Sequence, residues 1–188
     1  MGSGSGWTIA NPSRRLWLRH SVAACGGLAL GSACAHADAG DGISHTADAI
    51  HQEVTFQATA RQVYAALTVA SRFQKVESFS AAAKSLDINS PAAEIDAQAG
   101  GAFSLFAGYI TGRQLELVEG RRIVQAWRSG SWDAGMYSIA HFELSDKDGS
   151  AALVFDHAGF PAGTADHLAA GWHLNYWEPL GKYLATAG

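Results

Sequence analysis

The side chains best suited to acid–base or metal chemistry are histidines and an aspartate in the second half of the chain. His157 follows Asp156 at the end of an apolar run, so its imidazole could exchange a proton near neutral pH. With their neighbours these two residues form one candidate metal-ligand set: His141, Asp156, His157, His167 and His173. No pair in this set has the spacing of a zinc-binding helix motif, and no cysteine accompanies it. We therefore predict no metal site and keep His157 as the candidate catalytic residue, with a purely structural histidine as the alternative.

A second group of residues is aromatic and suits the binding of an apolar, planar ligand. Large rings recur through residues 103–176, in segments whose patterns predict strands and a final helix. The candidate lining of a ligand cavity comprises Phe103, Phe106, Tyr109, Trp127, Phe142, Phe155, His157, Trp172 and Tyr176. Such a cavity would select apolar molecules. The alternative is a solid core, in which each ring simply buries ~150–250 Å² of surface.

Four arginines, Arg113, Arg121, Arg122 and Arg128, fall on adjacent predicted strands. An arginine that faces inward could bind a ligand carboxylate in bidentate fashion, whereas one that faces outward is solvated at a strand edge. The sequence contains no Gly-x-Ser-x-Gly elbow and no Gly-x-x-x-x-Gly-Lys phosphate loop. We therefore predict no hydrolase, no nucleotidase and no cofactor.

Residues 1–37 are typical of an export signal. Arg14, Arg15 and Arg19 precede an uncharged run, Ser21–Ala35, that ends in the small-x-small pattern Ala35-His36-Ala37. The arginine pair and the residues after it resemble the twin-arginine motif, and a general secretory signal with a basic start is the alternative. The run of about 15 residues is shorter than the ~20 needed to cross a bilayer. We expect cleavage after Ala37 and a periplasmic or secreted protein.

Removal of the signal determines the net charge and the cysteine content of the mature protein. Residues 38–48 are small and polar, which indicates a flexible leader. Cleavage leaves 10 basic against 17 acidic side chains, a net charge of −7, so we predict no nucleic-acid partner and no stable membrane insertion. Both cysteines, Cys25 and Cys34, fall in the signal, which excludes a disulfide in the mature domain. Lipidation of Cys34 is a minor alternative, because Gly31 stands where lipoprotein signals carry a large apolar residue.

The remaining residues, 49–188, are expected to form one domain with the order strand, helix, several strands, helix. Alternating apolar residues from Ile50 predict a strand, and Thr59 caps a helix through Leu67. Residues 71–90 lack a clear period, although Phe73, Val76 and Phe79 suit a short second helix and a flap. Turn signals split residues 92–157 into antiparallel strands. Apolar residues every fourth position predict a helix over 164–186, kinked at Pro179.

This order of elements resembles the activator of heat-shock-protein-90 ATPase homologue branch of the SRPBCC, or START and birch-allergen-like, superfamily. The segments that carry the resemblance are 54–67, Gly100-Gly101-Ala102-Phe103, 112–127, Leu153-Val154-Phe155-Asp156-His157-Ala158-Gly159, Gly171-Trp172 and Leu180. The resemblance implies an α+β helix-grip fold, in which a curved antiparallel sheet of six or seven strands wraps around a long C-terminal helix. The sequence departs from the family in its export signal and in Phe73-Gln74-Lys75, where many relatives have a tryptophan.

From these features we expect an exported protein that binds a small hydrophobic molecule between the sheet and the last helix. A cyclase or aromatase that uses the same cavity is the first alternative, and it requires His157 or an arginine inside the pocket. A protein-interaction module, as the family name suggests, is the second alternative, and it requires an exposed apolar patch. An activity that depends on ATP is not expected outside the cytoplasm.

Overall fold

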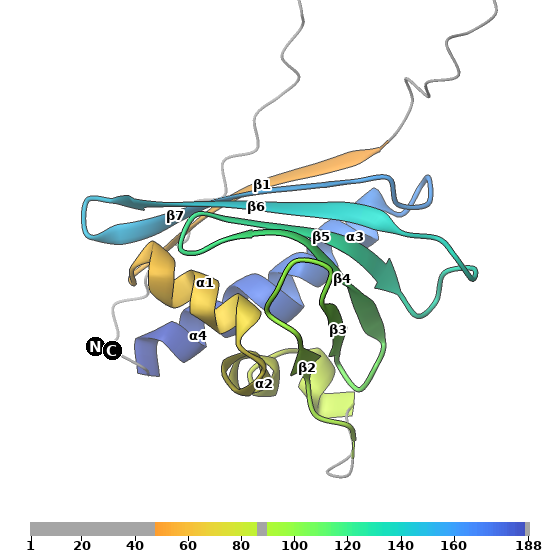
Figure 1. Cartoon of the computed structure of the whole chain (residues 1–188), viewed down its shortest axis with the longest axis horizontal. Coiled ribbons are helices and arrows are strands. Elements are labelled where there is room, and N and C mark those ends of the chain that lie inside the picture. Colours follow the sequence, from red (N-terminus) through yellow and green to blue (C-terminus); the bar gives the residue numbers. More distant parts are fainter. Residues whose placement is uncertain (1–47, 86–89, 187–188) are drawn as a thin grey trace, which may run out of the picture. The chain divides into compact units, whose positions relative to one another are not determined.

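An antiparallel sheet of seven strands organises residues 48–85 and 90–186, which are the residues that this computed structural model describes (Figure 1). The strands are β1 (Ala49–Phe56), β2 (Glu94–Ile95), β3 (Ala102–Leu105), β4 (Ile110–Val118), β5 (Arg122–Ser129), β6 (Ser138–Lys147) and β7 (Ser150–Ala158). Their order across the sheet is β1-β7-β6-β5-β4-β3-β2. The first strand therefore pairs with the last, and the strands from β2 to β7 form a meander.

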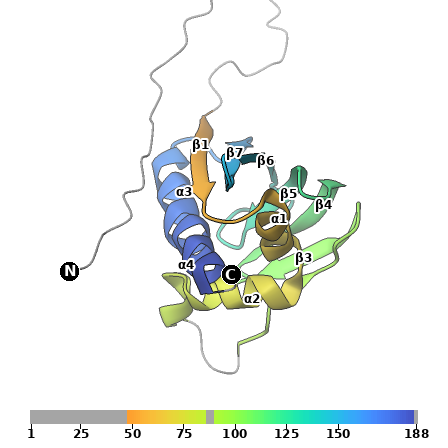
Figure 2. The same ribbon diagram turned by 90° about the vertical axis from the view of Figure 1, so that its left-hand side faces the viewer.

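The helices lie together on the inner face of the curved sheet (Figures 1 and 2). They are α1 (Ala60–Thr68), α2 (Ala70–Ser78), the 3₁₀ turn η1 (Ala82–Ser85), α3 (Ala165–Trp172), the π-helical turn η2 (His173–Trp177) and α4 (Glu178–Thr186). The α3–η2–α4 segment runs along the sheet, while α1 and α2 close the same layer. This arrangement confirms the predicted α+β class and the helix-grip fold.

The first helices begin and end where local side chains dictate. The Thr59 hydroxyl accepts from the Gln62 N–H at 3.2 Å, and the Gln62 side chain accepts from the Thr59 N–H at 2.8 Å, which completes a capping box. In α2, Phe73 and Val76 are buried as predicted. The predicted short helix is present, but it ends just before Phe79, which is its C-cap residue and is 41% exposed.

The β6–β7 hairpin follows directly from its sequence. Alternate β6 residues from Ser138 to Leu144 are buried, so the residues between them face outward. The turn residues Asp148 and Gly149 both have positive φ, at 51° and 78°, as a two-residue type I′ turn requires. Lys147 consequently pairs with Ser150, and the register continues to Ile139 opposite Ala158.

The C-terminal helix contains a π-helical turn where sequence analysis predicts a kink. Pro179 has no N–H to donate to the carbonyl of Asn175, so the regular series of α-helical hydrogen bonds is interrupted at this point. The structure accommodates the change just before Pro179, where the Glu178 N–H donates to the His173 carbonyl, five residues back. The wider turn lets the adjacent rings of Tyr176 and Trp177 both be buried.

Residues 1–47, which hold the predicted export signal and nearly all of the predicted leader, lie outside the described residues. The last leader residue, Asp48, accepts a hydrogen bond from the Gly163 N–H at 2.9 Å, next to the start of α3. In the described ranges, no helix combines the length and apolar character needed to cross a membrane.

Candidate functional site

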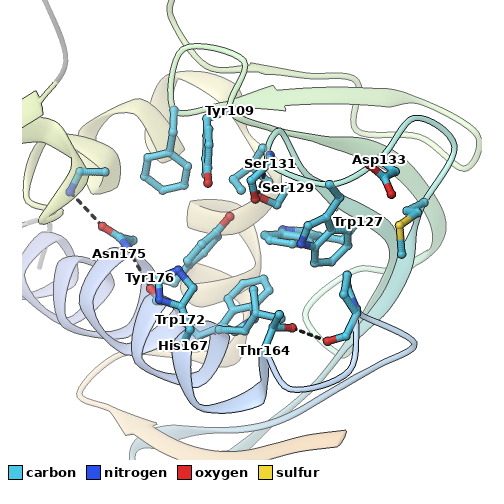
Figure 3. Close-up of a pocket in the computed structure, with 18 residues that line it drawn as sticks. Tyr109, Trp127, Ser129, Ser131, Asp133, Thr164, His167, Trp172, Asn175 and Tyr176 are labelled. Carbon is cyan, nitrogen blue, oxygen red and sulfur yellow. Dashed lines mark hydrogen bonds between the residues drawn. The ribbon is translucent and has the colours of Figure 1, made fainter. Parts of the chain in front are cut away.

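A pocket of about 530 Å³ opens between the sheet and the α3–η2 segment (Figure 3). Strands β4 and β5 form one wall, the helix forms the opposite wall, and the loops before β4 and after β5 form the rim. The lining residues are Ala82, Phe106, Tyr109, Ile110, Trp127, Ser129, Ser131, Trp132, Asp133, Met136, Pro161, Thr164, His167, Leu168, Gly171, Trp172, Asn175 and Tyr176. The lining is mainly apolar and aromatic, with hydroxyl and amide groups interspersed.

The structure brings five of the nine predicted lining residues to this pocket: Phe106, Tyr109, Trp127, Trp172 and Tyr176. The other four, Phe103, Phe142, Phe155 and His157, lie outside the lining and are packed in the core, with 0–3% of each residue exposed. All four side chains project inward from their strands, as the alternation of apolar residues predicts. Their positions along the strands, however, place them in the packed core beside the pocket.

Residues 130–136 form part of the pocket wall, although their sequence predicts only a turn. Trp132 from this loop packs edge-on against Trp127, with ring centroids 5.3 Å apart. Arg128 fixes the loop by donating to the backbone carbonyls of Trp132 at 2.7 Å and of Asp133 at 2.9 Å. One of the four arginines considered for a ligand carboxylate therefore binds backbone carbonyls instead. A tryptophan in a glycine-bounded loop was the available signal for the extra wall.

The loop before β4 forms the other side of the rim. Phe106 and Ala107 have φ of 50° and 57°, a left-handed conformation that is uncommon for residues with a side chain, and Gly108 continues it at 87°. The sharp turn buries Phe106 at 5% exposure and leaves Tyr109 54% exposed at the rim. Hydrogen bonds from Ser129 and Ser131 lower the pKa of the Tyr109 hydroxyl. The rim therefore presents a small group of hydroxyls above the aromatic walls.

Trp172 is the centre of the aromatic packing and belongs to both the core and the pocket. Its ring centroid lies 4.2 Å from that of Tyr176 and 4.4 Å from that of Phe155. The Trp177 ring stacks on it with an interplanar angle of 17° at 5.6 Å. The aromatic residues therefore form both a cavity wall and a solid core, since one side of this cluster faces the pocket and the other side is packed.

Both ring nitrogens of the buried His157 make hydrogen bonds. The Trp172 indole N–H donates to Nδ1 at 3.0 Å, so Nε2 must carry the proton that it shares with the Ser138 hydroxyl at 2.6 Å. Ser138 in turn donates to the Trp127 carbonyl at 3.1 Å. Burial lowers the pKa of His157 to about 4. The ring is therefore neutral and fully hydrogen-bonded, and it links three strands to α3.

Two polar atoms on the pocket walls lack hydrogen-bond partners in the described structure: the Trp127 Nε1–H and the Tyr176 hydroxyl. Burial raises the pKa of Tyr176, which therefore keeps its proton; a weak contact from the Trp127 indole N–H to the Tyr176 hydroxyl oxygen has the opposite, smaller effect. Glu77 on α2 lies close enough to interact electrostatically with Tyr176. Burial raises the pKa of Glu77 too, against a hydrogen bond from the Phe106 N–H that lowers it.

Residues 57–185 match the family model described as "Activator of Hsp90 ATPase homolog 1-like protein". The chain belongs to this family. It is 28% identical over 132 residues to mouse activator of 90 kDa heat shock protein ATPase homolog 2, covering 70% of this chain and 36% of that protein. It is 32% identical over 138 residues to an uncharacterised Schizosaccharomyces pombe protein, covering 73% of this chain and 37% of that protein. The chain thus spans little more than a third of the length of either relative.

Solved structures share the fold of this Hsp90 ATPase activator homologue-like chain. An HSP90 activator from Plasmodium falciparum superposes with a TM-score of 0.63 at 24% identity, over 73% of this chain and 96% of that one. CalU16 from Micromonospora echinospora superposes with a TM-score of 0.58 at 21% identity, over 74% and 77% of the two chains. In this chain the Phe73 ring packs against Phe106 and Tyr176, with centroids 5.8 and 5.7 Å apart.

Proposed function

We propose that this protein binds a small, planar, apolar molecule in the pocket between the sheet and the α3–η2 segment. The observation that carries the proposal is an aromatic-lined space of about 530 Å³, which lies within the range of ~300–1,000 Å³ typical of ligand sites. Rings from strands, loops and helix line it, so a flat ligand can be contacted on both faces.

The residues that the sequence suggested for catalysis do not reach this pocket. A cyclase-like reaction needs an acid or a base that reaches the ligand. The candidate catalytic residue His157 is outside the lining and already uses both ring nitrogens. Arg113 and Arg128 donate to backbone carbonyls, and Arg122 pairs with Glu116 and Glu143. None of these groups supports a proton-transfer step in the pocket.

A protein-interaction role is the second candidate, and it is favoured by the names of the relatives, which describe activators of a chaperone ATPase. The mouse relative is nearly three times as long as the matched region, so the activity of that whole protein does not transfer to one domain. The pocket gives the ligand-binding proposal a specific structural basis.

Filling the pocket at Gly171 is expected to weaken ligand binding. A Cβ at this helix position would meet no atom within 4 Å, so a larger side chain can extend into the open space. We expect Gly171→Phe to weaken binding of the neutral fluorescent probe N-phenyl-1-naphthylamine by about tenfold or more, measured by fluorescence titration. Gly171→Ala and Ala170→Leu, on the exposed side of the same helix, should bind as the unmodified protein does. Equal binding by Gly171→Phe, or no binding by the unmodified protein, would contradict the proposal.

We further propose that the protein acts outside the cytoplasm, on the basis of the twin-arginine-like start of the sequence. Replacing both Arg14 and Arg15 by lysine should retain the protein in the cytoplasm of a bacterial host, because that export route requires the paired arginines. Fractionation and immunoblotting measure the distribution. Export of the double variant would indicate the general secretory route, and retention of the unmodified chain would refute the proposal.

A further inference from the structure

We infer that the ligand carries an uncharged hydrogen-bond acceptor, such as a ketone carbonyl, that is received by the Trp127 indole N–H and the Tyr176 hydroxyl. This inference rests on the proposed function, since it names the polar group that the same pocket recognises. It is drawn from the two unpaired donors, the charges around them and the flat walls beside them.

The two donors are built into the pocket without a partner. Trp127 and Tyr176 are only 3% and 6% exposed, they come from β5 and η2 on facing walls, and both line the pocket. In the described structure their polar atoms make no well-formed hydrogen bond; the indole N–H approaches the Tyr176 hydroxyl only closely enough to lower its pKa slightly. Figure 3 shows the Tyr176 hydroxyl pointing toward the Tyr109, Ser129 and Trp127 side of the pocket rather than away from it. Buried donors normally have partners, so an acceptor from outside the chain completes this pair.

The donor types select an acceptor. An indole nitrogen can only donate a hydrogen bond, so the group that it meets must offer a lone pair. The Tyr176 hydroxyl stays protonated in its buried position and can donate to the same oxygen. A carbonyl oxygen has two lone pairs and can accept from both walls at once. A ligand hydroxyl could also accept from both donors, but it would bring a proton that needs an acceptor of its own in the pocket.

The charges around the pocket disfavour an anionic ligand. Among the described residues that line it, none is lysine or arginine, and the formally charged member is Asp133 at the rim. A second carboxyl group, on Glu77, interacts electrostatically with Tyr176. A ligand carboxylate would therefore lose its water shell without gaining a lysine or arginine partner, and it would lie in the same pocket as the Asp133 carboxyl group. A neutral acceptor avoids both penalties.

The test compares three naphthalenes of the same size that differ in one group: 2-acetylnaphthalene, 2-ethylnaphthalene and 2-naphthoate. We expect the ketone to bind at least about tenfold more tightly than the ethyl compound, and the carboxylate to bind more weakly than the ketone by a similar factor. Tyr176→Phe should reduce the affinity for the ketone by a larger factor than the affinity for the ethyl compound. This variant removes an unpaired hydroxyl and keeps the ring, so it is expected to fold.

A spectroscopic measurement separates hydrogen bonding from shape. Difference infrared spectra with a ¹³C-labelled ketone should show the bound carbonyl stretch at a lower frequency than in an aprotic solvent, with a smaller shift in Tyr176→Phe. Equal affinity for ketone and ethyl compound, or an unshifted carbonyl band, would overturn this inference while leaving ligand binding intact. Failure of all three compounds to bind would instead refute the proposed function.

Discussion

Replacing Gly112 by alanine is expected to destabilise the fold by about 3 kcal/mol or more, one of the two largest losses that we predict. Gly112 lies on the inner face of β4, opposite Phe103 on one side and Trp127 on the other. An added Cβ would collide with the Ala126 carbonyl oxygen of β5 and with the ring of Phe103. Because one of these atoms is backbone within the sheet, a side-chain rotation cannot relieve the collision. Chemical denaturation monitored by tryptophan fluorescence measures the change in unfolding free energy.

Gly171→Ala is the matched control for this substitution. It makes the same chemical change at a helical position where a Cβ meets open space. Alanine has the higher helix propensity, so this variant should be as stable as the unmodified protein or more stable by up to about 1 kcal/mol. If both variants lost the same stability, the steric role of Gly112 in seating Phe103 beside the pocket wall would be disproved.

His157→Ala is expected to cost about 3–5 kcal/mol, because it empties part of the core and removes the acceptor for the Trp172 N–H. The matched control is His51→Ala on the outer face of the sheet. His51 bonds to Asp156 at 2.6 Å, but its side chain is 42% exposed, so we expect a loss below about 1 kcal/mol. Similar losses for the two variants would contradict a structural role for His157.

The lowered pKa of His157 also predicts how the stability of these two variants depends on pH. In the folded protein the pKa of His157 is about 4, below the unfolded value of 6.5, so the unfolded chain takes up a proton first as the pH falls. Stability should therefore decrease from about pH 6.5 toward pH 4, by on the order of 3 kcal/mol from this group. His157→Ala should lack this part of the decrease. The pKa of His51 is raised by Asp156, which gives the opposite sign, so His51→Ala should retain the decrease.

Periodic segments explain why the fold could be predicted from the sequence. The alternation from Ser138 to Leu144, the Asp148-Gly149 turn and the Thr59 cap each determine a local geometry that the tertiary structure keeps. Phe79 shows the limit of this reasoning. Its spacing fits the stripe of Phe73 and Val76, yet α2 ends before it, because the chain then turns toward the helix layer, where the Ala81 N–H bonds to the Leu174 carbonyl.

The pocket was harder to predict because its walls depend on non-periodic segments. Alternation correctly places Phe142, Phe155 and His157 on the inner face, but it does not show which part of that face is packed against the helices and which part borders the pocket. The position of the pocket depends on the loop that carries Trp132 and on the sharp turn at Phe106. Both depend on contacts between residues distant in sequence, and the backbone bonds of Arg128 have no signature in a residue pattern.

The π-helical turn at His173–Trp177 also bears on how the family is compared. Such a turn holds one residue more than an α-helical turn, so it is equivalent to a single-residue insertion in a helix. Relatives with an uninterrupted helix should align with a one-residue gap between Trp172 and Glu178. The insertion lets Tyr176 face the pocket while Trp177 packs on Trp172 in the core. An alignment would register only a minor gap, although that gap decides which of two adjacent rings meets the ligand.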